Sequence, residues 1–456
     1  MVYEIEAEAA IALSRFGLGA HREGYKVLGK FPRKTLLAEI DRRDHPPAEL
    51  AALPSGPRLL QELIQYDNQV KTRNAAPNKN NLPSLPPDPY HASFFSEIDA
   101  RFNKVMLSDV IGFRERLVMF WSNHFAISYF KASETYTSVG AFEREAIRPY
   151  VFRKFSDMLT AVERHPCMLL YLDNTRSLGP NSKAGLAVSR GLNENLAREI
   201  LELHTLGVGS GYTQADVTAL SRVITGWSSN SEPEKGPVGA FIFHAVHHEP
   251  GTQTILGKSY PDKGMTQGMD VLNDLAIHPA TARHISFKLA RHFISDNPPI
   301  KVVARLEKAF NDTGGDLGAL TRALILSPEA WTPKRAKIRM PQEYLSAIMR
   351  LTGHRIAPQQ ILDFLRIMGQ PNWGADAPNG FSDLSSVWSS PAEMSARLSV
   401  ANYISYQIAD IPDPGLLVES AFGPILSDTT RQAITRAETR QQALTLLFMS
   451  PEFMRR

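Results

Sequence analysis

The stretch from Gly191 to Trp227 places the tightest limits on how this chain folds. In its first half, apolar residues recur every three or four positions, which predicts an amphipathic helix. These apolar positions are Leu192, Leu196, Ile200 and Leu203. Gly207 and Gly209 predict the end of that helix, because glycine readily adopts the left-handed conformation in which helices terminate. A second helix is predicted over about 213–226.

A second, polar stripe runs along the same predicted helix. Its members are Asn195, Arg198, Glu199 and Glu202, and His204 follows them directly. Charged groups within apolar sequence are costly to bury unless they are paired or hydrogen-bonded. The pattern therefore predicts a polar site in which Glu199, Glu202 and His204 are mostly buried. We expect these three residues to lie near His124 or Asp173.

Helical spacing recurs through most of the remaining chain, so the sequence predicts an all-α protein with over half of its residues helical. We expect one large helical domain over residues 1–456, built from many medium-length helices and long Pro/Gly-rich loops. Residues 228–262 are the least helical and predict an insertion of loops and short strands. The candidate strands of this small β element are 241–244 and 252–256.

Two further segments predict loops. Residues 72–90 (TRNAAPNKNNLPSLPPDPY) are rich in Pro and Asn, which predicts a mobile surface loop with little core contact. Residues 369–391 contain Trp373, Phe381 and Trp388 among Gly and Pro. Such an aromatic loop either lines a ligand site or, more commonly, covers a helical core.

Composition limits the classes of function. The formal net charge is +3 without a long run of Lys or Arg, so nucleic-acid binding is not indicated. Cys167 is the only cysteine, which excludes an internal disulfide and any multi-cysteine metal site. No apolar stretch approaches 18 residues, so no membrane span is predicted. As written, the acidic N-terminus lacks a signal peptide and predicts a cytoplasmic protein, whereas a trimmed sequence would also fit the periplasm.

Other candidate catalytic residues lie near the ends of apolar runs. His124 belongs to FWSNHF (120–125), where it is either catalytic or a hydrogen-bonded member of an aromatic cluster. Asp173 follows the apolar run 168–172, so it either serves a site or caps a turn. The full set of catalytic candidates is Glu199, Glu202, His204, Asp173 and His124.

Candidate substrate-binding residues come from the same part of the chain. They are Asn195, Arg198, Arg222, Trp227 and His248. The spacing of His244 and His248 would suit a metal ion on a helix. Pro250 and Gly251 instead favour a loop there, so no metal ligands are predicted, and the sequence identifies no cofactor.

Several motifs together resemble a known family. They are FWSNHF (120–125), MLLYLDN (168–174), residues 191–207, GYTQADV (211–217), TGW (225–227) and PNG (378–380). They are similar to motifs of the bacterial family DUF1800, and the resemblance runs through nearly the whole chain. It implies a mostly helical protein of uncharacterised function, without established catalytic residues to carry over. Genes of this family often lie beside those of DUF1501, whose members resemble exported alkaline-phosphatase-type proteins, and many relatives carry export signals.

Two hypotheses from different classes follow. In the first, the protein is a carboxylate-dependent hydrolase or transferase acting on a glycan or a phosphate-bearing substrate. The pKa values of Glu199 and Glu202 would be pushed apart, so that one is a general acid. Asp173 or His204 would supply the opposing group, and Arg198 and Arg222 would hold an anion.

The second hypothesis is a non-enzymatic interaction or escort protein that works with a DUF1501-type partner. The polar residues of the central helix would then form a buried network that specifies its packing. Side chains that converge on an open pocket favour the enzyme, whereas mutual pairing without a void favours the network. A carboxylate–histidine metal site is the weakest alternative, because the Glu-x-x-His pairs of di-iron bundles are absent.

Overall fold

The computed structural model describes residues 2–21, 23–42, 46–76, 84–108, 111–188, 191–408 and 413–456. Helices make up 63% of the chain and strands 4%, which confirms the predicted mainly α fold. In the described part of the chain, no helix is long and apolar enough to cross a membrane.

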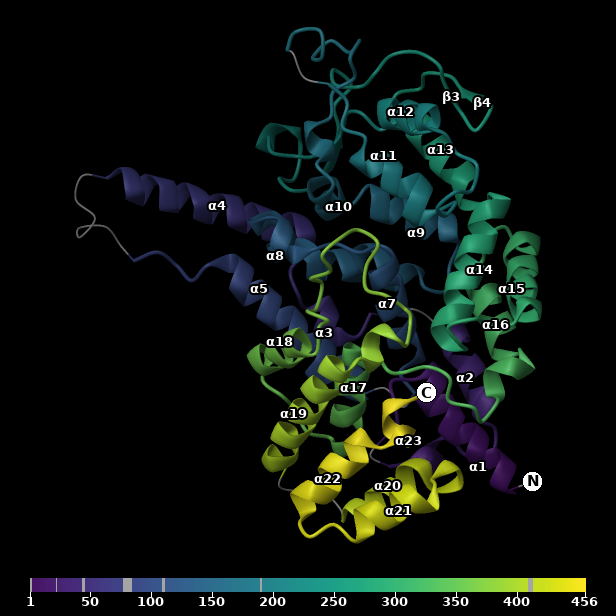
Figure 1. Ribbon diagram of the computed structural model, residues 1–456. Helices are drawn as coiled ribbons and strands as arrows, with labels where there is room; N and C mark the ends of the chain where they lie inside the picture. Colours follow the sequence, from purple (N-terminus) through teal and green to yellow (C-terminus); the bar gives the residue numbers. More distant parts are fainter. Residues whose placement is uncertain are drawn as a thin grey trace.

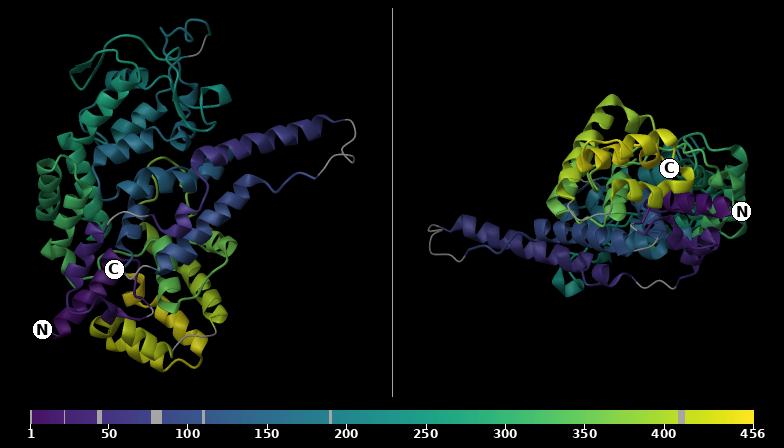
Figure 2. Two further views of the ribbon diagram at one scale, coloured as in Figure 1. Left: turned by 180° about the vertical axis from the view of Figure 1, so that it is seen from behind. Right: turned by 90° about the horizontal axis from the view of Figure 1, so that it is seen from below.

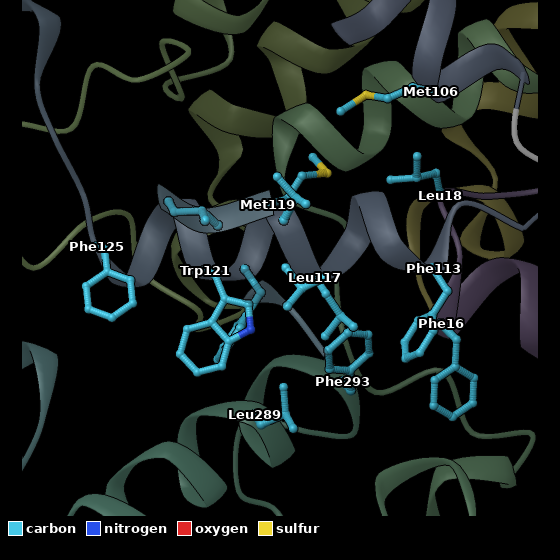
Figure 3. Close-up of a cluster of buried hydrophobic side chains, with 14 of the residues drawn as sticks. Phe16, Leu18, Met106, Phe113, Leu117, Met119, Trp121, Phe125, Leu289 and Phe293 are labelled. Carbon is cyan, nitrogen blue, oxygen red and sulfur yellow. The ribbon is translucent and has the colours of Figure 1, made fainter. Parts of the chain in front are cut away.

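Helix α7 (Phe113–His124) runs through the middle of the molecule, and nearly all of its side chains are buried. Figure 3 shows residues of α7 packed between Phe16, Met106 and Phe293 from three other parts of the chain. The aromatic rings of Phe16 and Phe113 lie 5.9 Å apart in an edge-to-face arrangement. A helix buried on every side must satisfy its charged residues internally, which makes α7 the centre of the ion pairs described below.

The N-terminal elements pack on one end of α7 and on the C-terminal helices (Figure 1). They are α1 (Val2–Ile11), η1 (Ala12–Phe16), η2 (Tyr25–Leu28), α2 (Pro32–Asp41) and α3 (Ala48–Ala51). Next come α4 (Gly56–Ala75), α5 (Pro89–Ile98), η4 (Asp99–Val105) and α6 (Met106–Ser108). Helices α4 and α5 form an arm that projects from the body in all views (Figures 1 and 2).

The loop predicted at 72–90 is shorter than expected. Helix α4 continues to Ala75, because Pro77 rather than the polar composition ends it. The residue before a proline is pushed out of the helical conformation, and Ala76 is extended accordingly, with ψ at 136°. Residues 84–88 have no regular structure, and α5 begins at Pro89. Residues 77–83 of the predicted loop lie outside the described residues.

The middle of the chain surrounds α7 and carries the motifs. Its first elements are η5 (Tyr129–Lys131), α8 (Ser133–Phe142), η6 (Glu143–Ile147), η7 (Arg148–Tyr150), α9 (Phe155–Glu163), α10 (Pro166–Tyr171) and η8 (Asn174–Arg176). They are followed by α11 (Asn195–Glu199), η9 (Ile200–His204) and α12 (Gln214–Val223). The predicted central helix is thus divided into a short α-helix, α11, and a π-helical turn, η9.

Both predicted strands are present within two small hairpins. β1 (Trp227–Ser229) pairs antiparallel with β2 (Phe241–Phe243), with Trp227 opposite Phe243. β3 (Gln253–Ile255) pairs antiparallel with β4 (Lys258–Tyr260). The short 3-10 helix η10 (Pro233–Lys235) lies in the connection between β1 and β2.

The remaining helices complete the body. They are α13 (Met265–Ala276), α14 (Pro279–Phe293), α15 (Ile300–Asp312), α16 (Leu317–Ile325), η11 (Pro328–Trp331), α17 (Pro341–Thr352), α18 (Pro358–Ile367), η12 (Val387–Ser389), α19 (Pro391–Gln407), α20 (Pro414–Phe422), η13 (Gly423–Ile425), α21 (Asp428–Thr435), α22 (Arg440–Met449) and α23 (Pro451–Met454). Proline stands in the first turn of many of them, where its missing N–H costs no hydrogen bond. α14 packs on α15, and α19 packs on α22.

Buried ion pairs tie these groups of helices to α7. Arg116 on α7 lies 2.8 Å from the carboxylate of Glu343 on α17, and Arg456 binds the same carboxylate at 2.8 Å. Glu115, also on α7, pairs with Arg148 of η7. All of these side chains are almost fully buried, so each charge depends on its partner for stabilisation.

Candidate functional site

The polar residues in and just before the π-helical turn η9 lie in three different environments. π-helical turns are rare and often mark functional sites. Glu199, just before the turn, lines an open cleft. Within the turn, Glu202 accepts a hydrogen bond from the Tyr212 hydroxyl at 2.8 Å, and His204 points into the core. The prediction that all three are mostly buried holds only for His204, because α11 lies at the surface and leaves both glutamates half-buried.

The open cleft has a volume of about 450 Å³, within the range of small-molecule sites. Four segments contribute its walls: η5 with the residue before it, the end of α10, both ends of α11 and the loop after α18. Its lining residues are Ser128, Phe130, Lys131, Tyr171, Leu172, Asn195, Glu199, Asp376 and Pro378. Glu199 and Asn195 were predicted from the sequence, whereas Asp376 was missed because it lies 177 positions after Glu199.

Glu199 is a half-buried carboxylate at the wall of this cleft. It makes no side-chain hydrogen bond or ion pair within the described residues, and its neighbour Arg198 instead binds Glu194 at 3.2 Å. Partial burial raises the pKa of Glu199 above its usual value. Burial, with a contribution from Glu199, also raises the pKa of the Tyr171 hydroxyl to about 12. Burial therefore makes the charged form of each group less favourable than it is in water.

Asp173 lies beside the cleft and is held there by a cation. Its carboxylate binds Lys131 Nζ at 2.7 Å, and Lys131 itself lines the cleft. The backbone of Asp173 is left-handed, with φ at 57°. This conformation is uncommon for residues other than glycine and is tolerated best by Asp and Asn. The sequence prediction placed Asp173 correctly at the end of a buried run, and its role in orienting Lys131 comes from the structure.

His204 and His124 belong to a separate, buried cluster. Their rings lie 6.3 Å apart, which confirms the predicted proximity. His204 Nδ1 donates to the Glu163 carboxylate at 2.8 Å, and Glu163 is fully buried. His124 Nε2 donates to the carbonyl oxygen of His204 at 3.1 Å, while Nδ1 accepts from Lys288 at 3.0 Å. No sequence pattern indicated Glu163 or Lys288, because they lie on two other helices, α9 and α14.

Electrostatics favour uncharged imidazoles for His124 and His284. Burial, with Lys288 nearby, lowers the pKa of His124 well below its usual value. Burial and Lys288 also lower the pKa of His284 to about 4, and the Nε2 of this residue donates to the Leu203 carbonyl at 3.2 Å. These hydrogen bonds fix the end of η9 where His204 turns inward. The cluster therefore positions the central segment, and none of these histidines lines the open cleft.

The predicted substrate-binding residues do not converge. Asn195 lines the cleft, whereas Arg198 is occupied by Glu194 and by Gln214, whose side-chain oxygen lies at 2.9 Å. Arg222 is half-buried on α12 and does not line the cleft. His248 is buried in the insertion, where its Nδ1 lies 3.1 Å from the Thr225 carbonyl oxygen.

Trp227 is fully buried and packs in the core rather than facing a ligand. Its ring lies against Phe241 and directly over Gly268 of α13. The reason is tertiary: α13 and β2 pack on the first residue of β1 and enclose its side chain. From the sequence alone, the position of Trp227 after a polar helix did not indicate that its side chain is buried.

A substitution at Gly268 tests this packing. The Cβ of alanine would overlap the Trp227 indole ring, so we expect Gly268→Ala to destabilise the protein by about 1–3 kcal/mol. Urea unfolding followed by tryptophan fluorescence measures the loss. Gly191→Ala is the matched control, because nothing lies within 4 Å of its added Cβ. Equal stability of the two variants would contradict the core role of Trp227.

A second, smaller cavity lies behind the cleft. Its volume is about 40 Å³, and its lining includes Ser122, Asn123, His292, Gln342 and Gln370. His292 Nδ1 binds the Asp383 carboxylate at 2.9 Å. Burial lowers the pKa of His292 to about 4 despite this contact. The aromatic loop 369–391 and the motif FWSNHF (120–125) both contribute lining residues to this cavity.

Among the described residues, no group of three or more His, Cys, Asp or Glu side chains is arranged to hold a metal ion. Searches of the curated proteins and of the solved structures return no match to this chain. One family model, described as "Protein of unknown function (DUF1800)", matches residues 11–455. That span contains every residue of the cleft and of the cavity behind it. The chain therefore belongs to the DUF1800 family.

Proposed function

We propose that the protein is a carboxylate-dependent hydrolase or transferase whose reaction takes place in the open cleft. One observation carries this proposal: Glu199 is a half-buried carboxyl group that lines the cleft without a partner among the described residues, and its burial raises its pKa. Perturbed carboxyl groups in clefts are typical of general acids.

Asp376 supplies the opposing group in this proposal. It lines the same cleft and is exposed to solvent, whereas Glu199 is half-buried. Glu199 would donate its proton to the leaving-group oxygen as the bond to that oxygen breaks. Asp376 would accept the proton of the attacking water or acceptor hydroxyl. Two carboxyl groups in different environments divide acid and base roles in this way.

The charges of the cleft favour a glycoside over a phosphate ester. Glu199, Asp376 and Lys131 are its ionisable lining residues other than Tyr171, and Lys131 is already neutralised by Asp173. Among the residues that the structure describes, an anionic substrate would therefore meet no available cation in this cleft. Asn195 and Ser128 offer neutral polar groups for hydroxyls, and Phe130 and Tyr171 offer aromatic surface.

The pH dependence of activity tests the proposal. We expect hydrolysis of a panel of aryl glycosides, with kcat/KM falling as the pH rises through the raised pKa of Glu199, because a general acid must carry its proton. Aryl phosphates at the same concentrations are the comparison. A rate that increases steadily toward alkaline pH, or activity confined to the phosphates, would contradict this assignment.

The arm supports a second candidate, an interaction protein. From Ile64 onward, most residues of α4 are exposed, and the helix projects beyond the body (Figure 2). A long polar helix that packs on little of its own chain is suited to contact another molecule. A DUF1501-type protein is the proposed partner. Co-purification with that partner before and after deletion of residues 64–92 measures this role separately from catalysis.

A further inference from the structure

The small cavity and the open cleft share one wall. Residues 126–127 line the cavity and Ser128 lines the cleft, so consecutive residues face the two spaces. The same holds for Ala375 and Asp376 in the loop after α18. These two segments are joined by a hydrogen bond from the Tyr129 amide to the Trp373 carbonyl oxygen at 2.9 Å. A substrate in the cleft is therefore separated from the cavity by a single layer of chain.

The ionic groups of the cavity are already matched. Arg101 lies 3.1 Å from Glu143, and Glu343 is bound by both Arg116 and Arg456. A charged ligand would have to displace one of these buried pairs, which is costly. The cavity thus disfavours both an anion and a cation.

The lining of the cavity also contains neutral polar groups that have no hydrogen-bond partner among the described residues. His292 is 3% exposed, and its Nε2 has no hydrogen-bond partner within the described residues. The nearest acid, Glu343, is 3.6 Å away, too far for a hydrogen bond. Because Nδ1 donates to Asp383, Nε2 of the neutral ring is an acceptor, and His292 is one of the residues that line the cavity.

Three more neutral groups line the same space. Ser122 makes no side-chain hydrogen bond to the described part of the chain. The side-chain oxygen of Gln370 accepts a hydrogen bond from the backbone amide of Gln342 at 2.9 Å. The side-chain nitrogen of Gln342 donates to the side-chain oxygen of Asn372 at 3.1 Å. Among the described residues, the side-chain nitrogen of Gln370 and the side-chain oxygen of Gln342 have no partner. They are therefore available to a ligand as a donor and an acceptor. Met119, Met340 and Trp373 complete the lining with apolar surface.

We propose that this cavity is a subsite for a neutral hydroxyl or hydroxymethyl group, with His292 Nε2 as the acceptor of its hydrogen bond. A hydroxyl group both donates and accepts, as the free groups of the cavity require. A volume of about 40 Å³ holds such a group or a few water molecules, but not a whole sugar ring. The subsite rests on the proposed glycoside reaction and assigns one end of its substrate.

A pair of hydrogen bonds joins two sequence motifs at the cavity. The Asn123 side chain donates to the Phe381 carbonyl oxygen at 2.9 Å and accepts from the Phe381 amide at 2.8 Å. Gly380, with φ at 71°, lies directly against Asn123, where a Cβ would collide. These bonds hold Phe381 in place as part of the cavity lining.

Histidine NMR of the full chain tests the subsite without any assay of activity. Glycerol is the hydroxyl probe, and acetate is an anionic probe of comparable size. We expect glycerol to shift the His292 Nε2 resonance saturably, and acetate to leave it in place. His248, buried in the insertion, is the internal control and should not respond to either probe.

Two variants assign and localise the signal. His292→Gln removes the His292 resonance and so assigns it. If this variant does not fold, a shift of one histidine resonance alone in Asp383→Asn provides the assignment. Ser122→Ala removes one cavity hydroxyl and leaves the His292–Asp383 pair intact, so it should weaken the glycerol response severalfold. An unmoved His292 signal, a drift shared with His248 or an equal response to acetate overturns the subsite. Activity on glycosides is measured independently, so the two proposals fail separately.

Discussion

Glu199→Gln is expected to fold like the wild-type protein and to lose catalytic activity by about 10²–10⁴-fold, the usual contribution of a general acid or base. The substitution preserves the shape of the side chain but removes the proton that the proposed reaction transfers. Stability should change little, because Glu199 has no ion-pair partner within the described residues. Thermal unfolding and initial rates on the best aryl glycoside measure the two effects.

Glu194→Gln is the matched control for this experiment. Glu194 precedes the same helix and pairs with Arg198, and it does not line the cleft. Loss of this partly exposed pair should cost below about 1 kcal/mol and leave the rate unchanged. If Glu199→Gln retains full activity, the assignment of the general acid is wrong. If it instead lowers stability by several kcal/mol, Glu199 has a structural role.

Glu343→Gln is expected to destabilise the protein by about 3–5 kcal/mol, the usual cost of breaking a buried ion pair. Arg116 and Arg456 both bind this carboxylate at 2.8 Å, and all three side chains are almost fully buried. Glutamine removes the negative charge and leaves two guanidinium groups buried without compensation. Urea unfolding at neutral pH measures the loss. Glu62→Gln, in the exposed pair with Arg58, should cost below about 1 kcal/mol.

Glu343 also makes the free energy of unfolding depend on pH. Burial alone would raise the pKa of Glu343, but Arg116 and Arg456 hold it well below the usual range. A depressed pKa stabilises the fold above the pKa of the unfolded chain, about 4.3 for glutamate, and this contribution is lost as the pH falls. Unfolding free energies between neutral and acidic pH should therefore decline more steeply for wild type than for Glu343→Gln. Parallel curves would exclude this linkage.

Local sequence patterns were sufficient to predict the fold class. Helical spacing predicted the mainly α fold, and the predicted strand at 241–244 corresponds to β2. Local proline chemistry also explains the later end of α4, since the helix continues to Ala75, two residues before Pro77. These features depend on neighbours in the chain, so periodicity and turn residues encode them directly.

The central stretch was correctly identified as polar, but its local sequence could not say where each side chain points. The turn η9 separates Glu199 from His204, so one faces the cleft and the other the core. Burial of His204 depends on Glu163, which lies 41 positions earlier, and burial of Trp227 depends on Gly268. Such contacts arise from packing between helices, which helical periodicity does not specify.

By itself, the sequence determined the helices, the small β element, the polar character of residues 191–204 and membership of the family. Only the tertiary structure decided which polar residues share a space. It brings Asp376 to the cleft of Glu199, and it joins His292 to Asp383 across 91 positions. The physical reason is that a site forms where distant segments meet. The energies that bring them together are long-range burial and ion pairing, not the local preferences that a single sequence displays.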